Sequence, residues 1–369
     1  METKIKVLIY LVTIYSINIL SQNQITIKQE FLIEDDRIGL VQGLDLDSNG
    51  NIYVGDLLSK KVYKYSKDGK FVQEIGNRGF GPGEFQSISG MKIWNDTLFV
   101  CDGAQQKITA FSLKNKPKYI YEIKLPLLEK GKLIPGIGNE RQGINSFWVI
   151  DNSSFVILYG SYSSSENLNK EKFIEAYLVS RDGKFIKTSP LFKILDREMI
   201  VVQSKNGFAT APMPYGRSGC LNTYNDNIFY ANNNEDIIHI FDAKSNTERS
   251  LKVNIDRIFI NPRLKENILD NLPDEILSIL KKSKTPFPEY FPLIENFFVT
   301  KDRIWISTYT EEFKKLKWLI IDLSNKNRSE LYLDSSIIFL KEKDNYLYGI
   351  KTVQFGLQQI VKYKIVNHK

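Results

Sequence analysis

The sequence predicts an all-β fold: a six-bladed β-propeller closed by an N-terminal strand, with a helical insertion between blades four and five. Two observations predict it. A unit of about 45 residues, built of short strands and tight turns, recurs along the chain, and four short strands per such unit form a propeller blade. The 19 Tyr and 22 Phe supply most of the aromatic content of 12%, and aromatic rings favour β-structure.

The repeat is clearest in three segments that share one pattern, a strand, a turn and a second alternating strand. They are residues 51–69, 97–115 and 227–245, and weaker copies follow at 154–164, 303–324 and 346–365. Asp56, Asp102 and Asn232 occupy the same position in the three clear copies. We expect these side chains to order the loop of each blade. The count of six units predicts six blades.

The segment ITIKQEFLI, residues 25–33, precedes the first full unit and has no partner strand of its own. We expect it to form the outer strand of the last blade. This arrangement closes the ring and leaves no open sheet edge.

The stretch DLDSNGNIYVGD, residues 45–56, fits the calcium loop of an EF-hand. Asp45, Asp47 and Asn49 fall at loop positions 1, 3 and 5, and Asp56 falls at position 12. An EF-hand needs a helix on each side of the loop, whereas here a strand interrupts it. Because Asn-Gly is the strongest short hairpin signal, we interpret Asn49-Gly50 as a turn between two strands and expect no metal there.

The segment RGFGPGEF, residues 78–85, lies between the first two units. It resembles the signature of the NHL-type repeat, Gly-x-Gly-Pro-Gly-Glu-Phe. We expect Gly79, Gly81 and Gly83 to adopt positive φ and Phe85 to pack between blades. A phosphate-binding loop is the alternative, but no helix follows the glycines. The chain after its leader resembles the six-bladed NHL-repeat or TolB-like propellers of exported bacterial proteins, which implies that fold and export.

Residues 1–22 have the pattern of a signal peptide: a charged start, an apolar run over 7–20 and a small residue, Ser21. We therefore expect residues 23–369 to form one exported propeller domain, periplasmic or secreted, with no transmembrane anchor and monomeric. Cys101 and Cys220 lie in or beside apolar runs, and we expect two buried thiols, with a single disulfide as the alternative.

The loops divide unequally between the two faces of the expected propeller. One face receives only tight turns, and the other receives the long segments 160–172, 204–219 and 257–292. The last contains apolar residues at helical spacing and is expected to form a helical cap. Because loops on one face of a rigid scaffold are common binding surfaces, this face is the expected ligand-binding face.

Four residues of this face are candidate ligand-binding residues: Arg78, Arg141, Tyr215 and Arg217. Arginines around a central opening suit a carboxylate or a phosphate, which they bind through two parallel hydrogen bonds. The alternative is that each arginine caps loop carbonyls or stays solvated.

Several function classes are disfavoured. After the leader only His239 and His368 remain, too few for a histidine zinc site or a nucleophilic triad. The net charge of +7 is scattered, so nucleic-acid binding is not expected.

We therefore expect a non-catalytic propeller without cofactor or metal. It would bind a peptide, a glycan or an envelope partner protein through its loop-rich face. A calcium-dependent lactonase-like hydrolase, with a metal held at the central axis by Asp45 and Asp47, is the alternative. A scaffold in an envelope assembly is a third.

Overall fold

The structure, a computed structural model, describes residues 25–126, 142–161, 171–204, 207–353 and 356–367. The expected signal peptide and Arg141 lie outside these residues. Within them, no helix is long and apolar enough to cross a membrane.

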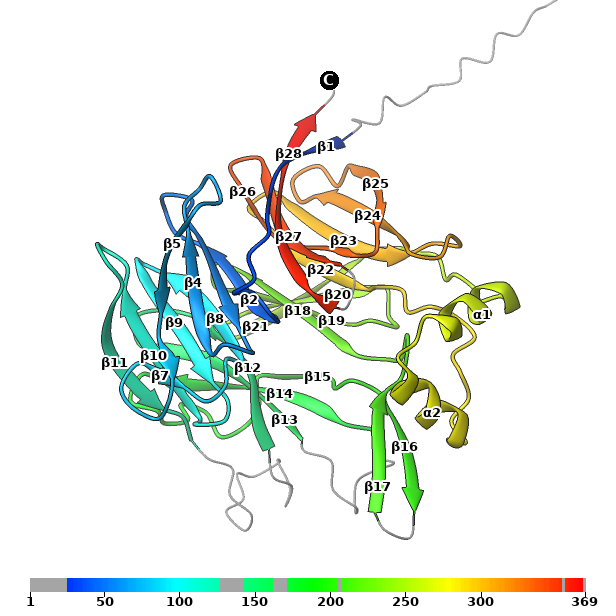
Figure 1. Cartoon of the computed structure of the whole chain (residues 1–369), viewed down its shortest axis with the longest axis horizontal. Coiled ribbons are helices and arrows are strands. Elements are labelled where there is room, and N and C mark those ends of the chain that lie inside the picture. The colour runs from blue at the N-terminus through cyan, green and yellow to red at the C-terminus, as the bar shows by residue number, and fades with distance from the viewer. Residues whose placement is uncertain (1–24, 127–141, 162–170, 205–206, 354–355, 368–369) are drawn as a thin grey trace, which may run out of the picture.

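Six four-stranded antiparallel sheets form a six-bladed propeller (Figure 1). Blade 1 contains β2 (Val41–Leu46), β3 (Ile52–Asp56), β4 (Lys61–Tyr65) and β5 (Phe71–Ile75). Blade 2 contains β8 (Gly90–Trp94), β9 (Thr97–Asp102), β10 (Lys107–Ser112) and β11 (Lys118–Lys124). Blade 3 contains β12 (Gln142–Val149), β13 (Ser154–Ser161), β14 (Phe173–Ser180) and β15 (Phe192–Leu195). Blade 4 contains β18 (Gly219–Tyr224), β19 (Asn227–Asn232), β20 (Ile237–Asp242) and β21 (Thr247–Lys252).

Blade 5 contains β22 (Asn296–Val299), β23 (Arg303–Tyr309), β24 (Lys315–Asp322) and β25 (Arg328–Asp334). Blade 6 contains β26 (Ile337–Lys343), β27 (Tyr346–Thr352), β28 (Gln358–Asn367) and β1 (Ile25–Ile33). The outer strand of blade 6 therefore comes from the other end of the chain. β1 pairs antiparallel with β28, with Ile25 opposite Asn367 at one end and Ile33 opposite Ile360 at the other, and the two strands lie side by side in Figure 1. This pairing joins the first strand to the last and closes the ring.

The hydrophobic core lies between neighbouring blades. Phe85 is fully buried and belongs to one cluster with Tyr53 of blade 1 and Leu98 of blade 2, as the sequence predicts. Between blades 5 and 6, Trp305 and Trp318 are fully buried in another cluster. Large aromatic side chains bury enough apolar surface to stabilise each of these interfaces.

The connection between blades 1 and 2 contains a short parallel pair, β6 (Asn77–Arg78) and β7 (Glu84–Phe85). Positive φ was expected at Gly79, Gly81 and Gly83, but only Gly83, at +75°, adopts it. The expectation is wrong at the other two positions. At Gly79 a Cβ would lie 1.9 Å from Glu84 Oε2, so the Glu84 side chain would have to move to accommodate it. That carboxylate accepts a hydrogen bond from the N–H of Gly81 at 2.8 Å.

The Asp56, Asp102 and Asn232 positions order the loops, as predicted. The Asp56 carboxylate accepts hydrogen bonds from the N–H groups of Gly39 and Leu40, at 2.9 and 2.6 Å, and of Ser59 at 2.7 Å. Asp102 accepts from the N–H groups of Gln86, Ala104 and Gln105 at 2.6–3.0 Å, and Asn232 accepts from the N–H of Leu195 at 3.0 Å. Asp56 and Asp102 therefore each tie a blade to the connection that precedes it, and Asn232 ties blade 4 to the last strand of blade 3.

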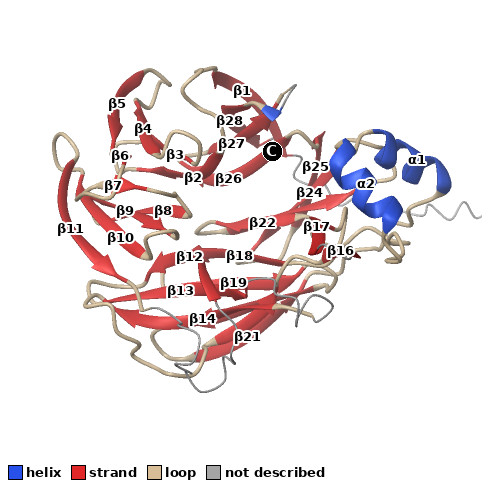
Figure 2. Cartoon of the chain, turned by 60° about the horizontal axis from the view of Figure 1, so that its bottom comes forward, coloured by secondary structure: helices blue, strands red, loops and turns tan. Residues whose placement is uncertain are grey.

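Two insertions lie outside the ring of blades. A hairpin of β16 (Met199–Ser204) and β17 (Gly207–Pro212) separates blades 3 and 4, and α1 (Pro262–Asp270) and α2 (Asp274–Lys282) separate blades 4 and 5. The second helix packs against the hairpin. Figure 2 shows both helices beside the propeller rather than over the ring of inner strands. Segment 204–219, expected to be a loop, therefore includes a β-strand.

Candidate binding channel

The two faces of the propeller differ in their connections. We call the face formed by the turns between the first and second strands of each blade the turn face; these turns are 47–51, 95–96, 150–153, 225–226, 300–302 and 344–345. We call the opposite face, which carries the hairpin and the helices, the loop face. The turn face was expected to hold only tight turns, but the longer connection 181–191 in blade 3 also lies there.

A cavity of about 1200 Å³ occupies the propeller axis and is here called the channel. Its lining comes from the inner strands of all six blades, β2, β8, β12, β18, β22 and β26, which lie at the centre of Figure 2. Turns 225–226, 300–302 and 344–345 also line it, so the channel extends to the turn face. The binding surface was expected on the loop face, whereas this cavity extends to the turn face.

Asp45 is the most buried acid of the channel lining, with 1% of its surface exposed. Its carboxylate accepts hydrogen bonds from the N–H groups of Leu46 and Ile93, both at 2.8 Å, and forms an ion pair with Lys341. Burial alone would raise the pKa of Asp45, but the charges of Lys341 and Lys92 and these hydrogen bonds lower it. Asp45 is therefore an anion with its oxygens engaged.

Lys92, on β8, is a second cation beside the same carboxylate. Burial and the charge of Lys341 lower the pKa of Lys92 to about 8, although Asp45 opposes the change. Within the described part of the chain, no hydrogen bond or ion pair engages the Nζ of Lys92. Beside Asp45 the channel therefore holds two ammonium groups against one carboxylate, and the ammonium of Lys92 has no acceptor among the described residues. Nearer the turn face the lining also includes Asp226, Lys301, Asp302 and Asp344.

Other polar groups in the channel are also uncommitted. Gln42, Ser146 and Thr223 line it, and their side chains form no hydrogen bond with any residue that the structure describes. The Oδ1 of Asn222 accepts from the N–H of Val299 at 3.2 Å, which leaves its amide N–H groups to donate. A ligand in the channel would thus meet several donors.

The remaining deep carboxylate, Glu342, is held by its neighbours. Its Oε2 accepts a hydrogen bond from Trp305 Nε1 at 2.8 Å, and Arg303 Nη1 lies 3.9 Å from Oε1. Burial raises the pKa of Glu342 in spite of both contacts.

The metal-loop pattern at 45–56 forms a turn. Asp47 accepts from the N–H groups of Asn49 and Asn51 at 3.0 and 2.9 Å, and Gly50 has φ of +81°. Asp45 instead contacts Lys341. Across the ranges that the structure covers, no three His, Cys, Asp or Glu side chains gather as metal ligands would.

Of the sequence-predicted site residues, Arg78, Tyr215 and Arg217 do not line the channel, and Arg141 lies outside the described residues. Arg78 is exposed on β6. Tyr215 packs edge-on against Phe291 and Tyr309, with ring centroids 4.8 and 5.3 Å away, beneath the helical insertion. Arg217 forms ion pairs with Glu171 and Glu198, at 2.8 and 3.4 Å, on the loop face. Their role in binding stays a prediction.

The cysteines and the histidine of the described chain have structural surroundings. Cys101 and Cys220 are buried and free, as expected. His239 Nδ1 lies 2.8 Å from Glu248 Oε1, and its ring stacks on Tyr230 with centroids 4.9 Å apart. Lys92 and Lys341 were missed by sequence reasoning, although a lysine within the innermost strand of a blade is a signal that could have found them.

Comparisons with known proteins agree with this architecture. The family model DUF5128, described as a 6-bladed beta-propeller, matches residues 29–234, more than half of the chain. A protein of Bacteroides fragilis NCTC 9343 described as exported is similar in structure, with a TM-score of 0.55 and 12% identity over 95% of this chain and 97% of that one. A DUF4221 family member from Bacteroides vulgatus ATCC 8482 has a TM-score of 0.50 and 10% identity over 94% and 100% of the two chains. No curated protein matches the sequence.

Proposed function

Because the chain belongs to the 6-bladed beta-propeller family DUF5128, we propose that it is an exported binding protein whose ligand occupies the central channel. One observation supports this most: a cavity of about 1200 Å³ is lined by all six inner strands. Sites for small ligands usually enclose a few hundred to about 1,000 Å³ and have a few polar groups that fix orientation. The channel is large enough for such a ligand and contains uncommitted donors.

Export is part of the proposal. Its support is the charged and apolar leader of residues 1–22, together with the likeness to a protein described as exported. Mass spectrometry of the protein recovered outside the cytoplasm tests it: loss of the leader is expected, and an intact N-terminus would contradict export.

The channel, rather than the loop face, is proposed as the binding site because its polar groups are free while two of the predicted loop-face residues are engaged. Tyr215 is packed among aromatic rings and Arg217 is paired with two carboxylates. A ligand would have to break those contacts, whereas the channel donors need no such exchange.

The hydrolase alternative needs carboxylates that converge on the axis. Among the carboxylates of the lining, Asp45 is engaged by Lys341, Glu342 by Trp305 and Asp226 by Lys244, while Asp302 and Asp344 lie in turns at the turn face. Among the described residues, no three His, Cys, Asp or Glu side chains gather as calcium ligands would. This contact pattern favours binding over calcium-dependent hydrolysis, and calcium addition tests the alternative directly.

A channel-plugging experiment tests the proposed function. Thr223→Trp and Gln42→Trp each place an indole in the channel lining, and Leu58→Trp, at a side chain 61% exposed, is the matched control. A panel of organic acids, acidic and neutral sugars and short peptides is screened by thermal shift on each variant. Compounds that stabilise the wild type and the control should fail on the plugged variants. Equal stabilisation of all four proteins would refute the channel as the site.

A further inference from the structure

Resting on the channel as the binding site, we propose that its ligand carries an oxyanion, a carboxylate or a phosphate, which binds the ammonium of Lys92. The argument begins with charge. Lys92 and Lys341 share Asp45, and the ion pair of that carboxylate is with Lys341. Lys92 is left as a cation inside the protein without a hydrogen-bond acceptor among the described residues.

The channel lining that includes Lys92 supplies hydrogen-bond donors. Ser146 and Thr223 contribute hydroxyl groups, and Asn222 contributes an amide whose oxygen is already used by Val299. An oxyanion accepts several hydrogen bonds at once, and bonds to a charged donor are shorter and stronger than neutral ones. A neutral ligand would leave the ammonium of Lys92 unpaired, and a cationic ligand would place another positive charge beside Lys92 and Lys341.

The other charged groups of the lining do not fill this role. β2 contributes Asp45, whose oxygens are engaged, and β12 contributes no titratable side chain. β26 contributes Lys341, Glu342 and Lys343. Lys343 donates to the backbone carbonyls of Asp47 and Ser48, and Glu342 accepts from Trp305. β18 contributes Tyr224, and the turns at the turn face contribute Asp226, Lys301, Asp302 and Asp344. Asp226 forms an ion pair with Lys244, and the charges that act on Lys92 are those of Lys341 and Asp45.

The affinity should depend on pH in a defined direction. Lys92 has its pKa lowered to about 8, so the ammonium is present at neutral pH and is lost as the pH rises through that value. A bound anion favours the charged form, so binding and protonation support each other. Asp45 stays ionised throughout this range because its pKa is lowered.

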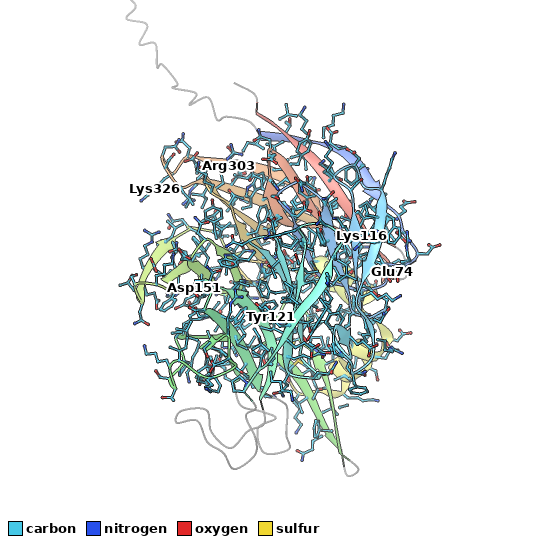
Figure 3. All side chains as sticks on the ribbon, turned by 90° about the vertical axis from the view of Figure 1, so that its left-hand side faces the viewer. Glu74, Lys116, Tyr121, Asp151, Arg303 and Lys326 are labelled. Carbon is cyan, nitrogen blue, oxygen red and sulfur yellow. The ribbon has the colours of Figure 1, made fainter. Side chains whose placement is uncertain are left out.

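Two probe anions distinguish the possible sources of the oxyanion. Sodium sulfate represents a phosphate-like tetrahedral group, and sodium glucuronate represents a carboxylate on a sugar. Unfolding midpoints are measured at constant ionic strength for the wild type, Lys92→Met and the control Lys116→Met. Lys116 is exposed in the turn between β10 and β11 (Figure 3). Comparison with the control removes the general stabilising effect of sulfate on folded proteins.

At least one probe should stabilise the wild type and Lys116→Met at pH 7, with affinity at least about 10-fold weaker for Lys92→Met, as loss of a charge-assisted bond predicts. In the wild type the affinity should fall by about 16-fold between pH 8 and pH 9.5, because about half of Lys92 is charged at pH 8 and about 3% at pH 9.5 when its pKa is about 8. Equal binding by Lys92→Met, or no binding of either probe to the wild type, would overturn the proposal.

The plugged variants separate this inference from the proposed function. If Lys92→Met binds a probe normally while Thr223→Trp and Gln42→Trp do not, the channel stands as the site and the role of Lys92 fails. If the plugged variants also bind normally, the channel itself is not the site and both proposals fail.

Discussion

Replacing Lys92 by Met removes the charge and keeps most of the unbranched side chain, so the change isolates the cost of an unpaired ammonium. The pKa of Lys92 is lowered from 10.5 to about 8. At 1.36 kcal/mol per pKa unit, keeping Lys92 charged in the folded protein therefore costs at most about 3 kcal/mol of stability. Because Lys92 is only partly buried and lines a channel open to water, we expect about 1–2 kcal/mol. Lys92→Met should therefore raise the free energy of unfolding at pH 7 by that amount.

The pH dependence follows from the sign of the shift. Below pH 8 Lys92 is charged in the folded and unfolded states, and the cost is fully present. Between pH 8 and 10.5 the unfolded chain binds more protons, so the wild type gains stability relative to Lys92→Met as the pH rises. The advantage of the variant should accordingly shrink and level off above pH 10.5.

Urea unfolding measures this difference at pH 7 and pH 10, in a buffer free of phosphate and sulfate. Taking the difference between two proteins cancels the tyrosines that titrate at high pH. Lys116→Met should stay within about 0.5 kcal/mol of the wild type at both values. A destabilised Lys92→Met at pH 7, or a difference that does not change with pH, would refute the reasoning about the channel charge.

Three further predictions concern the frame around the channel. Gly76→Ala should lower the free energy of unfolding in urea by about 2–3 kcal/mol, because Gly76 has φ of +76° and a Cβ would lie 2.3 Å from the Phe85 ring. The control Gly50→Ala, with φ of +81° and room for a Cβ, should lower it by about 1 kcal/mol, and equal losses would contradict the packing argument. Asp56→Ala should lower the free energy of unfolding by about 2–4 kcal/mol because three N–H groups lose their acceptor. The control Asp68→Ala, at an exposed residue, should change it by less than about 0.5 kcal/mol, and a similar effect of both would contradict the role of Asp56. Calcium and EDTA should leave the melting temperature unchanged, because Asp47 holds a turn; a rise with calcium that EDTA reverses would restore the hydrolase alternative.

Much of the frame could be predicted from the sequence because its cues are local. Asn49-Gly50 specifies a turn wherever it lies between two alternating strands, and the recurrence of Asp56 as Asp102 and Asn232 marks the same loop in successive blades. Residues 25–33 read as a strand without a neighbour, and they pair with the last strand of the chain. Gly79 shows the limit of such cues, because a glycine without positive φ looks the same in a sequence as one, such as Gly83, that adopts it.

The candidate site could not be predicted in the same way. Asp45, Lys92 and Lys341 lie on three different blades, and only the closure of the ring brings them together. Asp45 was recognised, but as part of a loop pattern with Asp47, whereas its partner is 296 positions away. The hairpin of β16 and β17 was not predicted, although Asn206-Gly207 is a hairpin signal, because it lies within a long connection between two blades that resembles a loop.

The most direct test of the account is to locate an anion in the channel. Crystals grown with sodium selenate carry an oxyanion whose selenium is identified by anomalous scattering. The account predicts an anomalous peak inside the channel, within hydrogen-bonding distance of Lys92 Nζ, that is absent from crystals of Lys92→Met. Peaks only at surface lysines, or a channel peak that persists in Lys92→Met, would contradict it.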